Sequence, residues 1–218
     1  STVSHELRTP LGPIKEGVSI ILDGLVGDVN SEQRALLEAV QRNAGRLHRL
    51  INDVLDYQKL DSGVFQFRFQ PENINGILEE VCKDMRLLTD EKGLSLDLQS
   101  DKNLPEVRCD KDRMVQVLTN LIGNAVKFTD SGGITVYTRQ GEGCAEVVIA
   151  DTGCGIKEED VPKLFKSFTQ IEGPRGRSTG GSGLGLAICK EIILSHGGKV
   201  WIESEYGKGS EVHFVLPI

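Results

Sequence analysis

The sequence has no apolar run that approaches the roughly 18 residues needed by a membrane-spanning helix. Its first residues also lack the basic and apolar regions of a secretion signal. Basic residues are fewer than acidic ones, 25 against 32 in 218 residues, and the net charge of −7 argues against a nucleic-acid-binding protein. These absences indicate a globular, cytoplasmic chain, which can reach a membrane only through segments upstream of this sequence.

The five cysteines lack the C-x-x-C pairs and the suitably spaced histidines of a zinc site. An odd number of scattered cysteines also fits no disulfide framework. We therefore expect reduced, structural thiols and no metal bound by cysteine.

Aromatic residues are nearly absent from the first 60 residues, where Tyr57 stands alone, and glycine is sparse through the first half of the chain. The first 122 residues hold 8 of the 25 glycines, whereas residues 123–218 hold 17. This change in composition predicts two domains, a helical one over residues 1–62 and a glycine-rich one over residues 63–218.

Apolar residues in the first domain recur at alternating steps of three and four, as on helices that pack at a shallow angle. One series covers 7–25 and a second covers 37–54, and Asn30 or Ser31 can cap the second helix. A helical hairpin of this size buries too little apolar surface to be stable alone. We therefore expect a homodimer through residues 1–60, in which two hairpins form a four-helix bundle.

The chain around His5 allows two local structures. If the first helix extends back through His5, the imidazole lies away from the apolar seam, beside Glu6 and one turn before Thr9. Alternatively, Thr9 caps a helix that starts at Pro10, and His5 belongs to the segment before it. Local chemistry leaves both alternatives open.

Periodicity in the second domain predicts alternating helices and strands. The predicted helices cover 74–90, 110–128 with Asp110 as its cap, a segment from about residue 158, and 184–195; the predicted strands cover 94–99, 134–139, 146–150, 199–204 and 211–216. Helices mixed with strand hairpins indicate an α/β sandwich with the helices on one face of the sheet.

Polar residues in two places of this domain suit a nucleotide. Asn120 and Asn124 lie one turn apart on the 110–128 helix, with Lys127 after them. The two asparagines offer neutral oxygens and the lysine offers a cation, a combination that suits magnesium and phosphate oxygens. Asp151 follows a strand directly, in the segment 151–156, where a buried carboxylate can accept a hydrogen bond from an exocyclic amine. The glycines after it let the backbone approach a flat ligand closely.

A third group of residues, 180–186, is rich in glycine and opens the last predicted helix. Its free amides and the positive end of the helix dipole favour phosphate. It is neither a Walker loop nor a dinucleotide fingerprint. The preceding segment, 173–178, has the flexible and basic composition of a mobile lid. The three groups together predict a nucleotide site with magnesium.

Motifs along nearly the whole chain resemble, in the same order, the sequence boxes of the sensor histidine kinases of two-component signalling. They are Ser4–Leu11 (H box), Asn120–Thr129 (N box), Asp151–Ile156 (first glycine box), Leu164–Phe168 (F box), Gly181–Leu186 (second glycine box), and Gly207–Ser210 with Leu216–Pro217 (terminal hairpin). The resemblance implies a dimerisation and phosphotransfer hairpin followed by a Bergerat-type ATP-binding domain. It also favours the helical, exposed alternative for His5.

The activity implied by the resemblance is phosphorylation of His5 by ATP, with Glu6 orienting the ring and accepting its proton. The phosphoryl group would then pass to an aspartate on the receiver domain of a response regulator. Thr9 resembles the residue that positions water for dephosphorylation of that regulator, so regulator phosphatase activity is implied as well.

The cofactors implied by the resemblance are ATP and Mg²⁺, with Asn124, supported by Asn120, as the metal ligands. The implied nucleotide-binding residues are Asn120, Asn124, Lys127, Phe128, Asp151, Gly153, Gly155, Ile156, Phe168, Arg175, Arg177, Gly181, Gly183, Leu184, Gly185 and Leu186.

The sequence departs from the family pattern at three positions. Gln170 follows the F box where many members have arginine, Cys154 replaces a small aliphatic residue, and Val212 replaces a frequent aromatic residue. Because the chain begins four residues before His5, we expect it to be the catalytic-core fragment of a longer protein.

Two other functions agree with parts of the sequence. One is a non-catalytic ATP-binding dimer scaffold or a phosphatase-only member, although His5, Glu6, Asn124 and Asp151 are all present. The other is an ATPase of the gyrase, chaperone or mismatch-repair kind, which requires a glutamate where this chain has Asn120.

Overall fold

The computed structural model of the chain describes residues 10–170 and 182–218. The chain forms two compact units, Ser1–Lys59 and Leu60–Ile218, which divide slightly before the boundary expected at residue 62. Across the two described ranges, no helix is both long and apolar enough to cross a lipid bilayer.

The first unit is a hairpin of helix α2 (Leu11–Leu22) and most of helix α3 (Ser31–Asp61). The first helix ends three residues earlier than its apolar series because the chain reverses at Gly24, whose φ is +73°. The N–H of Gly24 donates to the carbonyl of Ile21, and that of Leu25 donates to Ile20, both at 3.1 Å. This Schellman motif satisfies the last carbonyls of α2.

A reciprocal pair of hydrogen bonds starts helix α3. The side-chain oxygen of Asn30 accepts from the N–H of Gln33 at 2.8 Å, and the Gln33 side chain accepts from the N–H of Asn30 at 2.9 Å. This is a capping box, so the expectation that Asn30 can cap this helix is confirmed.

Part of the predicted apolar seam is exposed in the single hairpin. Val18 and Ala44 are buried, whereas Ile14, Val40 and Leu47 are 46%, 44% and 47% exposed. One hairpin therefore leaves large apolar side chains uncovered.

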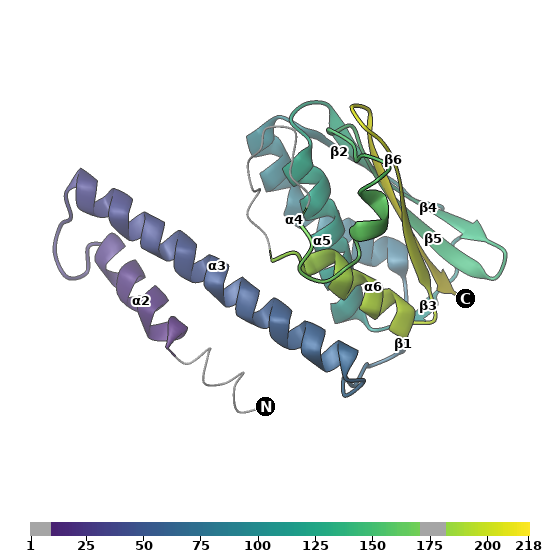
Figure 1. The fold of residues 1–218 in the computed structure, drawn as a ribbon, viewed down its shortest axis with the longest axis horizontal. Helices are drawn as coiled ribbons and strands as arrows, with labels where there is room; N and C mark the ends of the chain where they lie inside the picture. The colour runs from purple at the N-terminus through teal and green to yellow at the C-terminus, as the bar shows by residue number, and fades with distance from the viewer. Residues whose placement is uncertain (1–9, 171–181) are drawn as a thin grey trace. The chain divides into compact units, whose positions relative to one another are not determined.

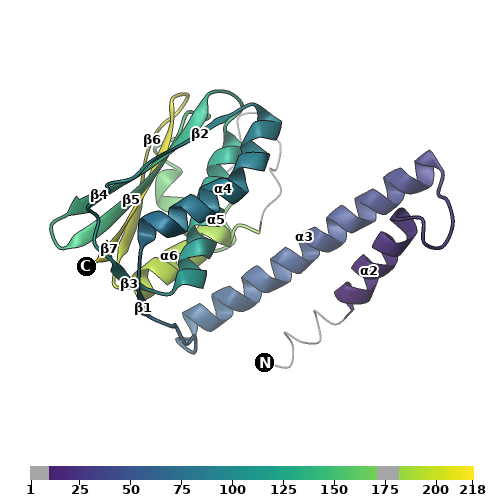
Figure 2. The same ribbon diagram turned by 180° about the vertical axis from the view of Figure 1, so that it is seen from behind.

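The second unit places three helices on one face of a five-stranded sheet (Figures 1 and 2). The helices are α4 (Ile74–Lys92), α5 (Lys111–Phe128) and α6 (Gly185–Ser195), and the strands are β2 (Ser95–Gln99), β4 (Gly133–Gly141), β5 (Cys144–Asp151), β6 (Lys199–Glu205) and β7 (Gly209–Pro217). The predicted helical region followed by an α/β sandwich is confirmed.

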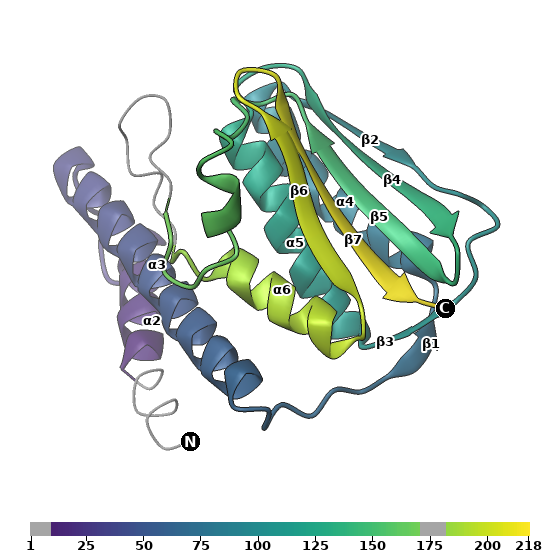
Figure 3. The ribbon, with the colours of Figure 1, turned by 45° about the vertical axis from the view of Figure 1, so that its right-hand side comes forward.

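The sheet has the order β2-β4-β5-β7-β6, and only β2 and β4 are parallel (Figure 3). Alternate residues of each strand point towards the helices, so Val147, Ile149 and Phe214 are buried in the core together with Leu118 and Ile188. Asp110 caps α5 as predicted, because its carboxylate accepts from the N–H of Arg113 at 3.2 Å.

The structure corrects one predicted element and adds two. The helix expected from about Glu158 is only a 3₁₀ turn, Val161–Lys163. Pro162 has no N–H to donate to the carbonyl of Glu158, so an α-helix cannot start there. Strands β1 (Gln70–Glu72) and β3 (Val107–Cys109) form a small antiparallel sheet that the sequence pattern did not indicate.

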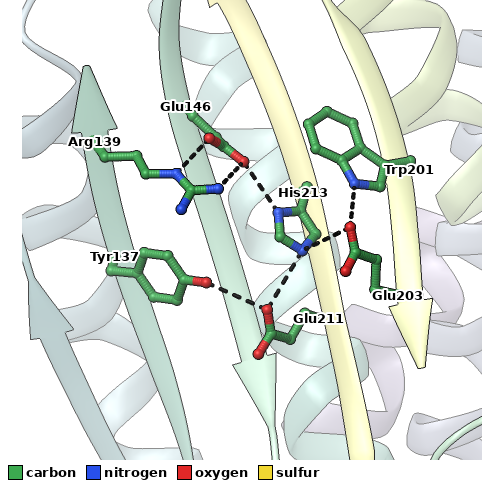
Figure 4. A network of polar contacts seen from close by, with 7 residues as sticks. All are labelled: Tyr137, Arg139, Glu146, Trp201, Glu203, Glu211 and His213. Carbon is green, nitrogen blue, oxygen red and sulfur yellow. Dashed lines mark hydrogen bonds and ion pairs between the residues drawn. The ribbon is translucent and has the colours of Figure 1, made fainter. Parts of the chain in front are cut away.

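The sheet face away from the helices carries a polar network (Figure 4). His213 stacks on Trp201 with ring centroids 4.9 Å apart, and its Nδ1 lies 3.1 Å from a carboxylate oxygen of Glu146. Arg139 donates two hydrogen bonds to the same carboxylate, at 2.6 and 3.0 Å. This network holds β4, β5, β6 and β7 together on the side opposite the core.

Candidate functional site

Helix α5 presents the asparagines beside the start of helix α6. Asn120 and Asn124 are half-buried on α5, and Gly185 is the first residue of α6. A Cβ added at Gly185 would lie 3.5 Å from Oδ1 of Asn120. The amino end of α6 therefore lies beside the amide side chain of Asn120, with room for an added methyl group between them.

A lysine from α4 holds the carboxyl end of α5. Nζ of Lys92 donates to the carbonyls of Val126 at 2.7 Å, Lys127 at 3.3 Å and Thr129 at 3.4 Å. A cation at this position satisfies carbonyls that no helical N–H can reach and opposes the negative end of the helix dipole. The neighbouring Lys127 places its own ammonium 4.9 Å from the ring centroid of Phe128.

Asp151 ends strand β5 as a half-buried carboxylate. Its Oδ1 accepts a hydrogen bond from the N–H of Gly153 at 2.8 Å. Burial raises the pKa of this carboxyl, whereas hydrogen bonds from the backbone of Gly153 and Ser210 lower it. The backbone thus favours the ionised acceptor, against the effect of burial.

The first glycine box packs tightly between α5 and the β6–β7 turn. A Cβ at Gly153 would come within 2.5 Å of the carbonyl oxygen of Phe128. Gly155 has a φ of +63°, and a Cβ there would collide with the carbonyl of Glu205. Both positions require glycine, and the packing brings Phe128 next to the loop that starts at Asp151.

The second glycine box meets the F box. Gly183 has a φ of +69°, and a Cβ there would come within 2.8 Å of the carbonyl carbon of Phe168. Phe168 itself has a φ of +60° and is 64% exposed. Leu184 is completely buried, so only its backbone faces the site, while Leu186 is half-buried.

Two family profiles match consecutive parts of the chain. The His Kinase A (phospho-acceptor) domain matches residues 1–63, and the histidine kinase-, DNA gyrase B-, and HSP90-like ATPase family matches residues 109–218. The second match covers half of the chain and contains every site residue described above except Lys92. The chain belongs to the histidine kinase family. It is the catalytic core of a sensor histidine kinase, in which an ATP-binding domain follows a phospho-acceptor domain.

Known histidine kinases are similar to this core over its whole length. The hybrid signal transduction histidine kinase L of Dictyostelium discoideum is 37% identical over an alignment of 223 positions, which covers 99% of this chain and 13% of that protein. The structure of full-length ShkA in complex with AMPPNP covers 99% of the chain with a TM-score of 0.85 and 32% identity, and the match covers 44% of ShkA.

A third similar structure is that of histidine kinase ThkA in complex with the response regulator protein TrrA. It covers 99% of this chain with a TM-score of 0.69 and 25% identity, and the match covers 60% of ThkA. The chain spans only part of its full-length relatives, between 13% and 36% of the length of three of them.

The asparagine pair of this histidine kinase core fits a magnesium ion that nucleotide phosphates also hold. Amide oxygens are hard, neutral donors, and Mg²⁺ commonly keeps several waters and takes further ligands from phosphate. Among the described residues, no cluster of three or more His, Cys, Asp or Glu side chains could hold a metal ion. Asn120 and Asn124 could hold a magnesium ion whose remaining ligands are phosphate oxygens and waters.

Six of the predicted site residues lie outside the described ranges: His5, Glu6, Thr9, Arg175, Arg177 and Gly181. Several of the described ones are neighbours in the structure. Asn120 lies against Gly185, and Phe128 lies against the loop from Asp151 to Ile156. Lys92 was missed by sequence reasoning, because nothing in its local sequence indicates which helix end it reaches.

Proposed function

We propose that this core transfers the γ-phosphoryl group of ATP to His5 and then to an aspartate of a response-regulator receiver domain. The observation that carries the proposal is the succession of a phospho-acceptor domain and an ATP-binding domain. The neighbouring positions of Asn120 and Gly185, and of Phe128 and Gly153, support it. The ThkA–TrrA complex supports a response regulator as the partner.

The described site residues have separate roles in holding ATP. Asp151 accepts from the exocyclic amine of adenine, and the ring of Phe128 packs against the base together with Ile156 and Leu186. Phe168 covers this region from the F box. Backbone amides at Gly183 and Gly185 and the dipole of α6 stabilise the phosphates.

The polar residues of α5 act on the other end of the nucleotide. Asn124 and Asn120 would hold Mg²⁺, which when bound spreads the negative charge that develops on the phosphates. Lys127 contacts the phosphates directly. Arg175 and Arg177, in the segment between the F box and the second glycine box, supply further positive charge near the γ-phosphate.

The transfer step begins with proton removal at His5. Glu6 accepts the proton from one ring nitrogen, so that the other can attack the γ-phosphorus. A new N–P bond forms while the bond from phosphorus to the bridging oxygen breaks, and ADP leaves with that oxygen. Thr9 positions water for hydrolysis of the regulator's aspartyl phosphate, which gives the core a phosphatase activity.

We further propose that the core works as a homodimer through residues 1–60. The exposed apolar side chains Ile14, Val40 and Leu47 support this, because a second hairpin would remove them from water. Mixing a His5→Gln chain with an Asn124→Ala chain tests the arrangement. Labelling of the mixture indicates transfer between chains, whereas confirmed heterodimers without label indicate transfer within a chain.

Labelling with γ-³²P-ATP and magnesium chloride tests the central proposal. We expect a phosphoprotein that is labile in acid and stable in base, no label on the His5→Gln variant, and normal label on the control variant His48→Gln. Equal labelling of the His5→Gln variant would refute the assignment. Nucleotide binding without label on an intact dimer would instead indicate a scaffold or a phosphatase-only protein.

A further inference from the structure

His196 closes helix α6 as a buried residue with both ring nitrogens engaged. Nδ1 lies 2.7 Å from the carbonyl of Ile192, and Nε2 accepts the backbone N–H of Asp110 at 3.0 Å. A carbonyl can only accept and an amide N–H can only donate. The ring is therefore neutral, with its proton on Nδ1.

Asp110 extends this contact to the chain segment before β1. One carboxylate oxygen caps α5 through the N–H of Arg113, and the other accepts the N–H of Arg68 at 2.8 Å. Two phenylalanines of the same segment contact the imidazole edge-on, Phe67 at 5.2 Å and Phe69 at 4.8 Å between ring centroids. This cluster ties three parts of the domain together.

Helices α5 and α6 contact each other along their length, and in the middle the thiol of Cys189 on α6 lies 3.8 Å from the carbonyl oxygen of Val117 on α5. Two further contacts lie near the ends of the pair. Near the nucleotide site, Gly185 at the start of α6 meets Asn120. At the opposite end, His196 after the end of α6 meets Asp110 before the start of α5. The two helices therefore run antiparallel. Sliding or tilting of one helix against the other would break one of these contacts.

We propose that His196 is a positioning residue for the nucleotide site, which fixes the register of α5 against α6 through its hydrogen bond to Asp110. Asn120 and Asn124 on α5 and the second glycine box on α6 must reach the same nucleotide, so their affinity for it depends on that register. This inference rests on the proposed function, since it takes ATP as the ligand of both helices.

Protonation of His196 would remove the acceptor that Asp110 needs. Nε2–H would then face the N–H of Asp110, so two buried hydrogen-bond donors would oppose each other without an acceptor between them. Burial lowers the pKa of His196, and the hydrogen bond to the carbonyl of Ile192 and the nearby Asp110 carboxylate offset this only in part. The charged groups at the cluster are Asp110 and Arg113 from α5 and Arg68 from the preceding segment, and the Arg113 guanidinium lies over Phe65 at 4.3 Å.

Two substitutions separate the two hydrogen bonds of the ring. In His196→Gln, the amide oxygen stands as many bonds from Cα as Nε2, so it can accept from Asp110. In His196→Asn, the amide nitrogen stands as many bonds from Cα as Nδ1, so it can donate to Ile192 but cannot reach Asp110. Both variants lose the imidazole ring and part of its packing, and they differ in the contact to α5.

The readout has two parts. One is the affinity of the full chain for a fluorescent ATP analogue, and the other is KM and kcat for ATP. Each is measured at a temperature where circular dichroism shows every variant to be folded. We expect KM to rise about 3- to 10-fold for His196→Asn, with kcat nearly unchanged. A change in KM of this size is within the range of effects that mutations away from a ligand commonly have on its affinity. His196→Gln should stay within about 2-fold of the wild type at neutral pH and lose the part of the acid-side weakening of affinity that protonation of His196 causes.

A matched control separates positioning from loss of stability. Asn75 links α4 to the carbonyl of Asp101 and the hydroxyl of Thr138, away from the nucleotide site. Asn75→Ala should lower stability and leave KM unchanged. Equal KM values for the Gln and Asn variants, or an equal rise in KM for Asn75→Ala, would overturn the inference. Should the wild type bind nucleotide without labelling His5, the proposed function fails, and the affinity comparison still decides the role of His196.

Discussion

The carboxylate of Asp151 and the backbone N–H of Gly153 form a hydrogen bond of 2.8 Å at the edge of the nucleotide site. This bond and the hydrogen bond from the backbone of Ser210 orient the carboxylate, whose remaining lone pairs can accept from a ligand. Substitution Asp151→Asn keeps the shape of the side chain but removes its charge. We expect nucleotide affinity to fall about 10- to 100-fold, the value of a hydrogen bond to a charged group, as measured by titration with a fluorescent ATP analogue.

The pH dependence of nucleotide binding supplies the control for Asp151. Burial raises the pKa of its carboxyl above the ordinary value of 3.8, so protonation weakens the acceptor at a higher pH than in an exposed aspartate. Wild-type affinity should therefore decline on acidification before the protein unfolds, and the Asn variant should lack the part of this decline that protonation of Asp151 causes. Asp97→Asn, at an exposed position of β2, should bind like the wild type. Identical affinity for both variants would exclude Asp151 from the site.

Gly155 and Gly143 share a left-handed backbone conformation but differ in the space around them. Their φ values are +63° and +70°. A Cβ at Gly155 would collide with Glu205, whereas a Cβ at Gly143 meets nothing within 4 Å. We expect Gly155→Ala to lower the free energy of unfolding by about 2–4 kcal/mol and Gly143→Ala by only about 1 kcal/mol.

Urea denaturation measures both effects, and nucleotide titration adds a second comparison. Gly155→Ala displaces the loop that follows Asp151, so its nucleotide affinity should fall, while Gly143→Ala should bind normally. Equal destabilisation by the two variants would show that backbone strain alone decides both positions.

Local sequence signals were enough to predict the elements that carry the site. Asp110 caps α5 through a bond to a residue three positions away, and Asn120 and Asn124 share a helix face because of the helical repeat. Asp151 follows a strand whose apolar run is visible in the sequence. These predictions depend on neighbours within one or two turns, which is the range that periodicity and capping describe.

Contacts between distant residues were beyond that range. Lys92 reaches the carbonyl of Val126 from another helix, and the edge-on contacts of Phe67 and Phe69 join His196 across more than half of the chain. Nothing in the local pattern of either partner indicates the other. The helix expected from Glu158 is different, since Pro162, whose missing N–H opposes that helix, is visible in the sequence itself.

Lys92 should contribute to both the stability and the ligand affinity of the domain. The substitution Lys92→Met keeps the aliphatic length but leaves the carbonyls of Val126 and Lys127 without their donor. We expect the free energy of unfolding to fall by about 1–2 kcal/mol, because one good hydrogen bond and a favourable interaction with the helix dipole are lost. Fraying of this helix end should also raise KM for ATP, since Lys127 and Phe128 belong to it.

The exposed lysine Lys83 on α4 offers a matched control for this experiment. Lys83→Met removes the same charge from the same helix without touching α5. Urea denaturation and ATP titration of both variants should show an effect for Lys92→Met only. A similar loss in both would mean that net charge, and not the cap on α5, is responsible.

Glu146 should make the stability of the sheet depend on pH at the acid end. Its pKa is lowered from 4.5, first by the hydrogen bonds from Arg139, then by the hydrogen bond from His213, although burial opposes both (Figure 4). A carboxyl whose pKa is lower in the folded state stabilises the fold above the unfolded pKa, and this contribution is lost as the pH falls through the folded pKa. The wild type should therefore exceed Glu146→Gln in stability at pH 7, and the difference should shrink below about pH 4.5.

Thermal or urea unfolding at several pH values between 7 and 3 measures this difference. Glu203→Gln provides the control, because Glu203 lies 4.0 Å from Nε2 of His213 and its side chain is 67% exposed. That variant should stay close to the wild type near pH 7. A Glu146→Gln protein whose stability runs parallel to that of the wild type across the whole range would show that the Arg139 contact contributes nothing in solution.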